Sequence, residues 1–455
     1  QLLDDDGELV TYESHYPDTH VMDTWTTNER GEVTLPMLLE QGVYTLVEVQ
    51  APEGYVKAIE GKTISVGAVY NDWDDPIEVE FADMPQKGTI SVVKHDSATG
   101  EPVSDSVYVV KAASDIITGD GTARAHAGDI VATLETDGEG RATSGELYLG
   151  TYTVYEAKAK DGYALDVAEK TVTLSYQGQD VAVFDEVLEV EDVPTELKVK
   201  KADALDPDKP VAGAVFRLWN DEETYDEELV TGEDGAISVQ YLEHGSYHLQ
   251  ETAAPEGYVV SDVDDEGNAA VHDLTVNDQG MFEREGGTMS AVFEVEIANM
   301  PKTMGTTATD ASSGTHEGQA REELAIVDVV EYTGCIPGDE YTVEGVLMDA
   351  ETGEPALDDD GNEITAQATF VAEDFAGSVE VTFAFSGAGL AGKRLVAFET
   401  MACGGEEYMV HADIEDEAQT VAIVEPEEDA PEGETPGKGY PKTGAEVYVS
   451  LNLSN

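Results

Sequence analysis

One motif occurs three times in this chain, and its repetition constrains the fold more than any other feature. The copies read GVYTLVEVQAPEGY at 42–55, GTYTVYEAKAKDGY at 150–163 and GSYHLQETAAPEGY at 245–258. Each is followed further along by a strand-like segment that ends in a turn: IEVEFADMP, VLEVEDVP and FEVEIANMP. A unit of about a hundred residues, rich in two-residue alternation and in Gly, Asp and Pro turns, predicts a string of β-sandwich domains.

The repeats and two later changes in composition divide the chain into segments. We predict an all-β protein of tandem immunoglobulin-like β-sandwich domains in an elongated array. The first unit lacks the opening strand of the next two, so we interpret the chain as a fragment whose N-terminus is missing. The predicted segments are domain 1 at 1–86, domain 2 at 87–194, domain 3 at 195–302, domain 4 at 303–424 and a terminal linker with a signal at 425–455.

Composition narrows the class of partner. The chain has 97 acidic and 23 basic residues, a net charge of −74, which would repel nucleic acid and anionic membranes. Hydrophobic residues make up 41% of the sequence, which is enough for packed cores. The two cysteines, Cys335 and Cys403, are too few for a disulfide scaffold, and buried free thiols are a simpler interpretation than a disulfide between them.

Several strand-like segments place a polar residue on an otherwise apolar face, because residues two apart share one face of a strand. In domain 3 these residues are Lys201, Glu251 and Asn299, each preceded two positions earlier by an apolar residue. In a chain with so few basic residues, a lysine that recurs at the same inward position is not a solvated surface residue. The matching residues are Lys94, Glu156 and Asp192 in domain 2, and Glu48 and Asp83 in domain 1.

A buried ion pair is the ordinary interpretation of any one such lysine or glutamate. The repetition of all three residue types in register favours a reaction instead. Burial lowers the pKa of a lysine and raises the pKa of a glutamate, which leaves a neutral amine beside a protonated acid. That amine is a nucleophile at high effective concentration, and the acid can polarise the acceptor carbonyl and carry protons. The predicted product is an isopeptide bond, with loss of ammonia from an asparagine or of water from an aspartate.

The motif Y-x-L/V-x-E-x-x-A-x-x-G-Y, with K-x-D near the start of a unit and N/D-x-P at its end, resembles the Cna-B repeats of Gram-positive surface proteins and pilins. The resemblance implies an inverse immunoglobulin-like sandwich with an autocatalytic cross-link. Residues 1–47 contain no lysine, so Glu48 and Asp83 are expected to lack a partner in this chain. The bonds implied are Lys94–Asp192, assisted by Glu156, and Lys201–Asn299, assisted by Glu251.

Domain 4 resembles the VaFE-type domains, with a Thr–Gln ester bond, that occur beside Cna-B repeats. The matching features are a Thr-Thr pair at the start, an aspartate in IVDVV, the sequence VAFE and the spacing His411-x4-Asp416-x2-Gln419. The resemblance implies that a threonine hydroxyl attacks the side-chain carbon of Gln419 and releases ammonia. Thr306 is the predicted nucleophile, because it shares a strand face with a small alanine, and Thr307 is the alternative. The assisting residues implied are His411 and Asp416, with Asp328 and Glu399 as supporting acids.

The end of the chain resembles a sorting signal. After residue 424 a run rich in Pro, Glu and Gly predicts an extended linker. It leads to YPKTG, which is similar to the L-P-x-T-G signal that sortases cleave between Thr and Gly. A tyrosine replaces the usual leucine, and the tail that follows is neither an apolar span nor basic. The predicted signal consists of Tyr440, Pro441, Lys442, Thr443 and Gly444.

These features predict a structural stalk of a cell-wall-anchored adhesin or pilin subunit, extracellular and resistant to force and proteolysis. The expected partners are sortase, peptidoglycan or neighbouring pilin subunits, and host matrix protein; no nucleic-acid partner, metal or cofactor is predicted. The acidic run 262–273 is spaced loosely like a calcium loop, but its strand-like flanks favour a solvated hairpin. The cross-linking would be a single turnover, so the chain is not predicted to be an enzyme. The alternative function is a ligand-binding adhesin module that recognises host matrix protein or glycan.

Overall fold

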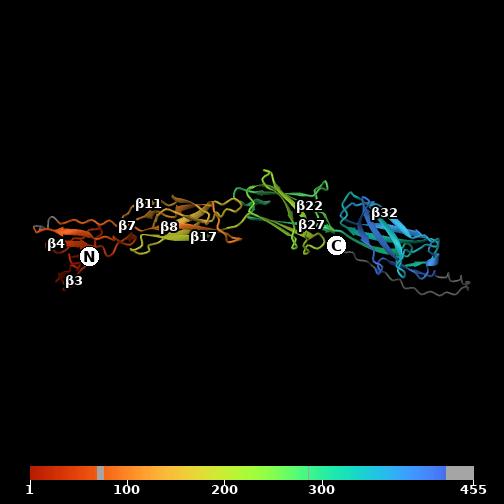
Figure 1. The fold of residues 1–455 in the computed structure, drawn as a ribbon, viewed down its shortest axis with the longest axis horizontal. Coiled ribbons are helices and arrows are strands. Elements are labelled where there is room, and N and C mark those ends of the chain that lie inside the picture. Colours follow the sequence, from red (N-terminus) through yellow and green to blue (C-terminus); the bar gives the residue numbers. More distant parts are fainter. Residues whose placement is uncertain (69–75, 285, 427–455) are drawn as a thin grey trace, which may run out of the picture. The chain divides into compact units, whose positions relative to one another are not determined.

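The computed structural model describes residues 1–68, 76–284 and 286–426. Strands form almost all of the regular structure in these ranges, which confirms the all-β prediction (Figure 1). The one helix there is η1 (Ala388–Leu390), a single 3-10 turn, and none of the described helical structure could cross a membrane. Backbone contacts separate a first compact unit, which holds domains 1 to 3, from a second unit, which holds domain 4 and the short segment 257–259.

Domain 1 contains only short strands and a small core around Leu2, Ile64 and Val66. The sequence predicts a strand over 77–85, but only the last two of these residues form one. The equivalent strands of domains 2 and 3 pair with the first strand of their own domain, and the described part of domain 1 supplies no such partner for this segment. The strands are β1 (Leu2–Leu3), β2 (Tyr12–Ser14), β3 (His20–Met22), β4 (Gly42–Leu46), β5 (Tyr55–Val56), β6 (Lys62–Val66) and β7 (Met84–Pro85).

The strands of domain 2 are β8 (Lys87–Asp96), β9 (Val107–Ala112), β10 (Ile116–Ile117), β11 (Ala123–Ala125), β12 (Ile130–Glu135), β13 (Arg141–Thr143), β14 (Leu147–Tyr148), β15 (Gly150–Lys158), β16 (Lys170–Leu174) and β17 (Val183–Asp192). One sheet has the order β12-β9-β15-β16, and the other joins β13, β8 and β14 with β17, which pairs with β8. The first and last strands, β8 and β17, are parallel neighbours, with Lys87 opposite Val183 and Asp96 opposite Asp192 (Figure 1).

The strands of domain 3 are β18 (Glu196–Asp203), β19 (Val215–Asn220), β20 (Asp226–Val230), β21 (Ala236–Gln240), β22 (Gly245–Ala253), β23 (Tyr258–Val260), β24 (Val271–Val276), β25 (Phe282–Glu283), β26 (Met289–Ser290) and β27 (Val292–Pro301). They repeat the plan of domain 2. One sheet contains β21-β18-β27 and the other contains β20-β19-β22-β24. The first and last strands, β18 and β27, are again parallel neighbours, from Glu196 opposite Val292 to Asp203 opposite Asn299.

The strands of domain 4 are β28 (Thr303–Asp310), β29 (Glu317–Gln319), β30 (Leu324–Thr333), β31 (Glu340–Asp349), β32 (Thr365–Val371), β33 (Ala376–Phe385), β34 (Arg394–Cys403), β35 (Glu406–His411) and β36 (Thr420–Val424). They form one sheet of β28-β30-β33 and a second of β29-β36-β34-β31-β32, where β35 also pairs with β34. The start and end of the domain meet where the Ala308 amide donates to the Ala418 carbonyl at 2.9 Å.

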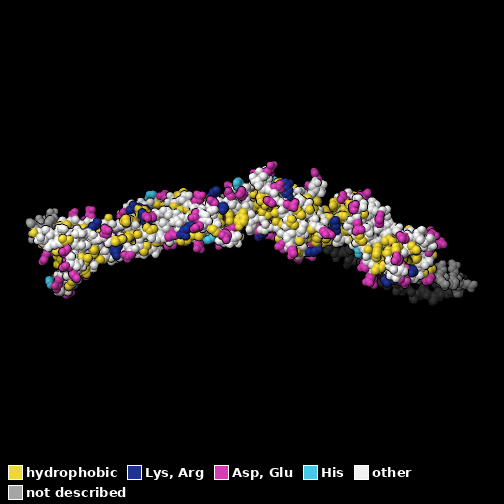
Figure 2. Space-filling model, viewed as in Figure 1, with side chains coloured by type: hydrophobic (Ala, Val, Ile, Leu, Met, Phe, Trp, Pro, Cys, Tyr) yellow, Lys and Arg dark blue, Asp and Glu magenta, His cyan; other side chains and the backbone are white. Residues whose placement is uncertain are grey.

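The two-residue period of the strands explains where the cores lie. In β8 the side chains of Ile90, Val92 and Lys94 are all fully buried, and in β18 Leu197, Val199 and Lys201 take the same positions. Acidic side chains are instead scattered over the surface along the chain on the face shown in Figure 2. The same alternation that builds each core therefore carries a lysine into it.

Candidate cross-linking sites

The polar residues predicted in domain 3 meet at one buried point. Lys201 comes from β18, Glu251 from β22 and Asn299 from β27, and none of the three is more than 3% exposed. The Lys201 Nζ donates to Glu251 Oε2 and to Asn299 Oδ1, each at 2.7 Å. The Asn299 Nδ2 donates to Glu251 Oε1 at 2.6 Å. The three side chains form a closed ring in which every polar atom has a partner.

Strand pairing explains how this ring assembles. The parallel register of β18 and β27 sets Lys201 opposite Ile297, so that Asn299 lies two residues further along on the same inner face. Glu251 reaches the ring from β22 in the other sheet. Residues that are far apart in the sequence therefore meet because each follows the apolar alternation of its own strand.

Burial is the largest cause of two opposite pKa shifts in this ring. It lowers the pKa of Lys201, although the charge of Glu251 opposes the shift. It raises the pKa of Glu251, although the charge and hydrogen bond of Lys201 oppose that shift. Both shifts favour a neutral amine beside a protonated carboxyl group. The ring of Phe216 covers the amine, with its centroid 5.7 Å from Nζ.

Domain 2 brings its three predicted residues together in the same way, with one addition. The Lys94 Nζ donates to Glu156 Oε1 at 2.7 Å and lies 2.5 Å from Asp192 Oδ1. It also donates to the hydroxyl of Tyr108 at 2.7 Å. Lys94, Glu156 and Asp192 are at most 2% exposed. The sequence analysis did not find Tyr108; a comparison of the repeats would have shown it opposite the glutamate, where domain 3 has a phenylalanine.

The acceptor carboxyl of domain 2 is held differently from the amide of domain 3. Both oxygens of Asp192 are buried and neither takes part in an aligned hydrogen bond with the described residues, although Oδ1 is close to Nζ. Burial first, and then the charge of Glu156, raises the pKa of Asp192 to about 7 against the attraction of Lys94. The second oxygen of Glu156 accepts the Asp166 amide at 3.0 Å. Protonated Asp192 is therefore accessible near neutral pH.

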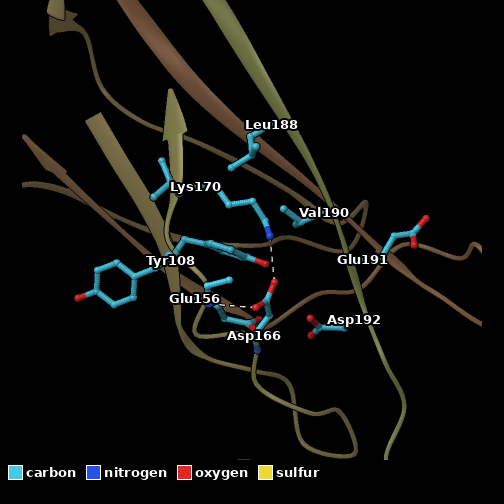
Figure 3. Close-up of a pocket in the computed structure, with 11 residues that line it drawn as sticks. Tyr108, Glu156, Asp166, Lys170, Leu188, Val190, Glu191 and Asp192 are labelled. Carbon is cyan, nitrogen blue, oxygen red and sulfur yellow. Dashed lines mark hydrogen bonds and ion pairs between the residues drawn. The ribbon is translucent and has the colours of Figure 1, made fainter. Parts of the chain in front are cut away.

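A small cavity lies beside this site. Its volume is about 10 Å³, roughly the space for one water molecule. Figure 3 shows Tyr108, Glu156, Asp166 and Asp192 around it. Condensation of an amine with a carboxylic acid releases water, so the cavity offers the leaving group a place next to Asp192.

Domain 1 holds the two predicted acids without an amine. Glu48 accepts the Ala58 amide at 2.8 Å, and one oxygen of Asp83 is buried without a hydrogen-bond partner. Burial first, and then the neighbouring Glu48, raises the pKa of Asp83 to about 6. Among the described residues, Lys57 pairs with Asp180 at 3.1 Å, and no lysine forms an ion pair with Glu48 or Asp83.

In domain 4 Thr306 and Gln419 are in direct contact. Thr306 lies on β28, Gln419 directly precedes β36, and the Gln419 Nε2 donates to the Thr306 Oγ1 at 2.6 Å. Glu399 of β34 contacts both: its Oε2 accepts Nε2 at 2.9 Å and the threonine hydroxyl at 3.4 Å. Thr306, Glu399 and Gln419 are at most 7% exposed, whereas Thr307 points outward. This geometry favours Thr306 over Thr307 as the nucleophile.

Two carboxyl groups lie together under this contact. Burial first, and then the neighbouring carboxyl group of Asp328, raises the pKa of Glu399 to about 10. Burial also raises the pKa of Asp328, against the effects of Glu399 and Thr306. The carboxyl oxygens of Asp328 are fully buried without an aligned donor among the described residues. Glu399 is therefore protonated at neutral pH, and it is the group closest to the reacting atoms.

His411 and Asp416 lie at the edge of the domain 4 site. The His411 Nε2 is 3.1 Å from Asp416 Oδ2, but among the described residues neither side chain forms a hydrogen bond with the side chain of Thr306 or Gln419. Burial opposes the lowered pKa of Asp416, but the hydrogen bonds from His411 and the Ala418 amide outweigh it. The sequence motif predicts the main role for this pair, whereas the residue in contact with both Thr306 and Gln419 is Glu399.

The remaining predicted features lie outside these sites. Cys335 is buried, with its Sγ 3.7 Å from the Met401 Sδ, and both cysteines are free thiols. Asp264, in the acidic run, accepts the backbone amides of Glu266 and Asn268 in a turn. No group of three potential metal ligands is present among the described residues. The YPKTG signal lies outside the described residues.

Two family models match the chain. A prealbumin-like fold domain matches residues 1–80, 88–186 and 195–278, which together are more than half of the chain. A T-Q ester bond containing domain matches residues 302–423. The sequence matches no curated protein.

Solved structures with some similarity include surface proteins of Gram-positive bacteria. The Bacillus anthracis TIE protein is 16% identical, with 93% of this chain and 64% of that chain covered and a TM-score of 0.28. A streptococcal ancillary pilin is 18% identical, with 57% and 76% covered and a TM-score of 0.23. The shaft pilin SpaA from Lactobacillus rhamnosus GG is 13% identical, with 48% and 99% covered and a TM-score of 0.21. Because these TM-scores are low, the assignment of the family rests on the prealbumin-like model, which matches more than half of the chain.

Proposed function

This chain belongs to the family of proteins with prealbumin-like fold domains, and on that premise we propose that it is a load-bearing stalk of a Gram-positive surface adhesin or pilin. Its domains 2, 3 and 4 would each carry one covalent cross-link formed by the domain itself. The observation that carries this proposal is the closed ring of Lys201, Glu251 and Asn299, with contacts of 2.6 and 2.7 Å inside a core. The T-Q ester match over domain 4 supports the same function.

In domain 3 the reaction would join Lys201 to Asn299. The neutral Nζ attacks the side-chain carbon of Asn299, and the bond from that carbon to Nδ2 breaks. One proton passes from the amine to Nδ2, and ammonia leaves. Glu251 contacts both the amine and the leaving nitrogen, so it is placed to carry this proton.

In domain 2 the same attack by Lys94 on Asp192 would release water instead of ammonia. The amine loses one proton, and the departing hydroxyl of the protonated Asp192 gains one. Glu156 forms no hydrogen bond with the Asp192 carboxyl group among the described residues. Its Oε1 accepts a hydrogen bond from the Lys94 amine at 2.7 Å, so Glu156 can receive the proton that the amine loses. The raised pKa of Asp192, about 7, supplies the protonated acid that this route needs.

In domain 4 the Thr306 hydroxyl would attack the side-chain carbon of Gln419 to form an ester, and its proton would leave with Nε2 as ammonia. Because Glu399 is protonated at neutral pH, a half-turn of the Gln419 amide would give it a carbonyl oxygen to polarise. Glu399 could then pass its proton to the leaving nitrogen and take the proton of the hydroxyl.

The positions of the cross-links explain how they would bear load. Tension would enter domain 2 through β8 and leave through β17. A covalent bond between Lys94 and Asp192 would carry this force directly, so the residues between positions 94 and 192 would not be stretched. The Lys201–Asn299 and Thr306–Gln419 bonds would do the same for their domains. Closing a loop of about a hundred residues would also add roughly 4–5 kcal/mol of stability on the chain-entropy model. An amide or ester does not depend on redox conditions, unlike a disulfide.

The expected location and partners follow from the same proposal. A stalk of this kind would be extracellular, joined by a sortase at Thr443 to peptidoglycan or to a neighbouring pilin subunit. This part rests on the YPKTG sequence and its position after the linker.

Stretching single molecules by their two ends tests the load-bearing function. We expect domains 2, 3 and 4 to give no unfolding extension, because the force bypasses their interiors. The variant Asn299→Ala should add one extension event that releases the residues between Lys201 and position 299. Extension of all three domains in the unmodified chain would contradict the proposal.

A further inference from the structure

Domains 2 and 3 differ at one residue next to the lysine. Tyr108 on β9 lies opposite Glu156 on β15, and Phe216 on β19 lies opposite Glu251 on β22, so the two aromatic residues occupy the same position in the fold. Both are buried, and their ring centroids lie 5.1 and 5.7 Å from the lysine Nζ. The hydroxyl of Tyr108 is the part without a counterpart in domain 3.

This hydroxyl gives Lys94 a third polar neighbour. The Nζ lies 2.7 Å from the Tyr108 Oη, 2.7 Å from Glu156 Oε1 and 2.5 Å from Asp192 Oδ1. A neutral amine has two N–H groups and one lone pair. If the N–H groups donate to Tyr108 and Glu156, the lone pair is left to face Asp192.

Lys201 has no such third polar neighbour among the described residues. Its two hydrogen bonds go to Glu251 and to Asn299, so one N–H group of the amine is bound to the acceptor itself. The side chain of Asn299, the acceptor in domain 3, is held in place by the hydrogen bond that its Nδ2 donates to Glu251. Asp192 has no aligned hydrogen bond that would hold it in this way. In domain 2 the orientation of the attack therefore depends on the groups that hold the Lys94 amine.

We propose that Tyr108 is a positioning residue for the cross-link of domain 2: its hydroxyl accepts one N–H group of Lys94 and so directs the amine lone pair at the side-chain carbon of Asp192. This inference rests on the proposed function. The hydroxyl takes no part in the atom balance, in which one proton leaves the amine and water leaves Asp192. Its effect is on the rate of attack, through the fraction of time that the amine is correctly oriented.

The test is the variant Tyr108→Phe in the full chain, made by synchronised cell-free synthesis and quenched at intervals in acid denaturant. Peptide mass spectrometry would measure linked and unlinked Lys94–Asp192 and Lys201–Asn299 in the same molecules. We expect the domain 2 bond to form up to about tenfold more slowly, the size of one hydrogen bond between neutral groups, and the domain 3 bond to form at an unchanged rate. Equal domain 2 rates in the variant and the unmodified chain would overturn the role of Tyr108.

A stability measurement separates positioning from packing. In the background Glu156→Ala, which leaves domain 2 unlinked, Tyr108→Phe should leave the Tm of domain 2 unchanged, because Phe216 shows that this fold accepts the bare ring. A fall in Tm that accounts for the slower reaction would overturn the positioning role.

The reciprocal variant Phe216→Tyr provides an independent test if Tyr108→Phe does not fold. It gives Lys201 a third neighbour, so we expect the domain 3 bond to form faster, and an unchanged rate would count against the proposal. If the unmodified chain forms the domain 3 bond but never the domain 2 bond, the proposed function of domain 2 fails together with this inference. If both bonds form, and the domain 2 bond forms at the same rate in Tyr108→Phe as in the unmodified chain, only the inference about Tyr108 fails.

Discussion

In domain 3 a buried amine meets one carboxyl group, whereas in domain 4 a buried hydroxyl meets two. Lys201 has Glu251 beside it, and burial already lowers the pKa of its amine. Thr306 has Glu399 in contact, with Asp328 behind it, and together with burial Asp328 raises the pKa of Glu399 to about 10. A hydroxyl is the weaker nucleophile, so its acceptor has to be activated more strongly. On the proposed mechanism, domain 4, which has the weaker nucleophile of these two sites, is therefore the one with a second assisting acid.

The largest expected effect is the loss of a bond. Glu251→Ala should leave Lys201 and Asn299 unlinked, and Glu399→Ala should leave Thr306 and Gln419 unlinked, so that each variant is heavier by one ammonia in addition to the substitution. Each affected domain should lose roughly 4–5 kcal/mol of stability. Intact-mass measurement and thermal unfolding check both outcomes.

Glu296→Ala is the matched control for these variants. Glu296 lies on β27 with Asn299, but its side chain is 68% exposed and forms a surface ion pair with Lys200. It should keep every bond. Formation of the domain 3 bond without Glu251 would break the comparison, because the amine would then need no acid at all.

The raised pKa of Glu399 predicts a pH dependence in unlinked domain 4. In Thr306→Val no ester can form, and Glu399 keeps a folded-state pKa of about 10 against its ordinary 4.5. The stability that it contributes is therefore complete below about pH 4.5 and is lost as the pH rises towards 10, by at most about 1.4 kcal/mol per pH unit. Denaturant unfolding at several pH values measures this slope.

The double variant Thr306→Val with Glu399→Gln serves as the reference for that slope. It should remove most of the pH dependence between 5 and 9 that is specific to domain 4. A single variant whose stability is flat over this range would show that Glu399 is not held protonated.

A smaller effect is expected at His411. It forms a hydrogen bond with Asp416 but with neither reacting residue of domain 4. We therefore expect His411→Ala to slow ester formation by less than about tenfold, while Glu399→Ala stops it. Time-resolved peptide mapping of the Thr306–Gln419 link distinguishes the two. A complete block by His411→Ala would return the main role to the histidine.

The smallest effect is expected in domain 1, whose described residues place no amine beside Glu48 and Asp83. Glu48→Gln and Asp83→Asn should leave the number of lost water and ammonia molecules unchanged. Removing the repulsion that helps to raise the pKa of Asp83 to about 6 should stabilise the domain by under about 1 kcal/mol at pH 7. A gain of one water or one ammonia in either variant, beyond the mass change of the substitution itself, would show that domain 1 forms a bond within this chain.

Alternation and repetition were enough to predict the domain 3 site. Lys201, Glu251 and Asn299 each continue an apolar face, and the structure brings them into one ring. The strand expected over 77–85 did not form, because alternation describes one face of a strand and cannot show whether a neighbour is there to pair with its backbone. The predicted domain boundaries and the roles of the site residues remain predictions.

Contacts that depend on packing between sheets were harder to predict. Tyr108 resembles any buried aromatic residue until its distance to Lys94 is known. The spacing of His411, Asp416 and Gln419 pointed to a site in domain 4, but local spacing could not show that Glu399 contacts Thr306 and Gln419 directly. Such distances depend on how β28 of one sheet packs against β34 and β36 of the other sheet.

The most direct test of the account is the intact mass of the purified chain, followed by sequencing of any linked peptides. The account predicts a mass below that of the sequence by one water and two ammonia molecules. It also predicts that the peptide containing Lys201 is recovered joined to the peptide containing Asn299. A chain with the full mass of its sequence, and with these peptides separate, would contradict it.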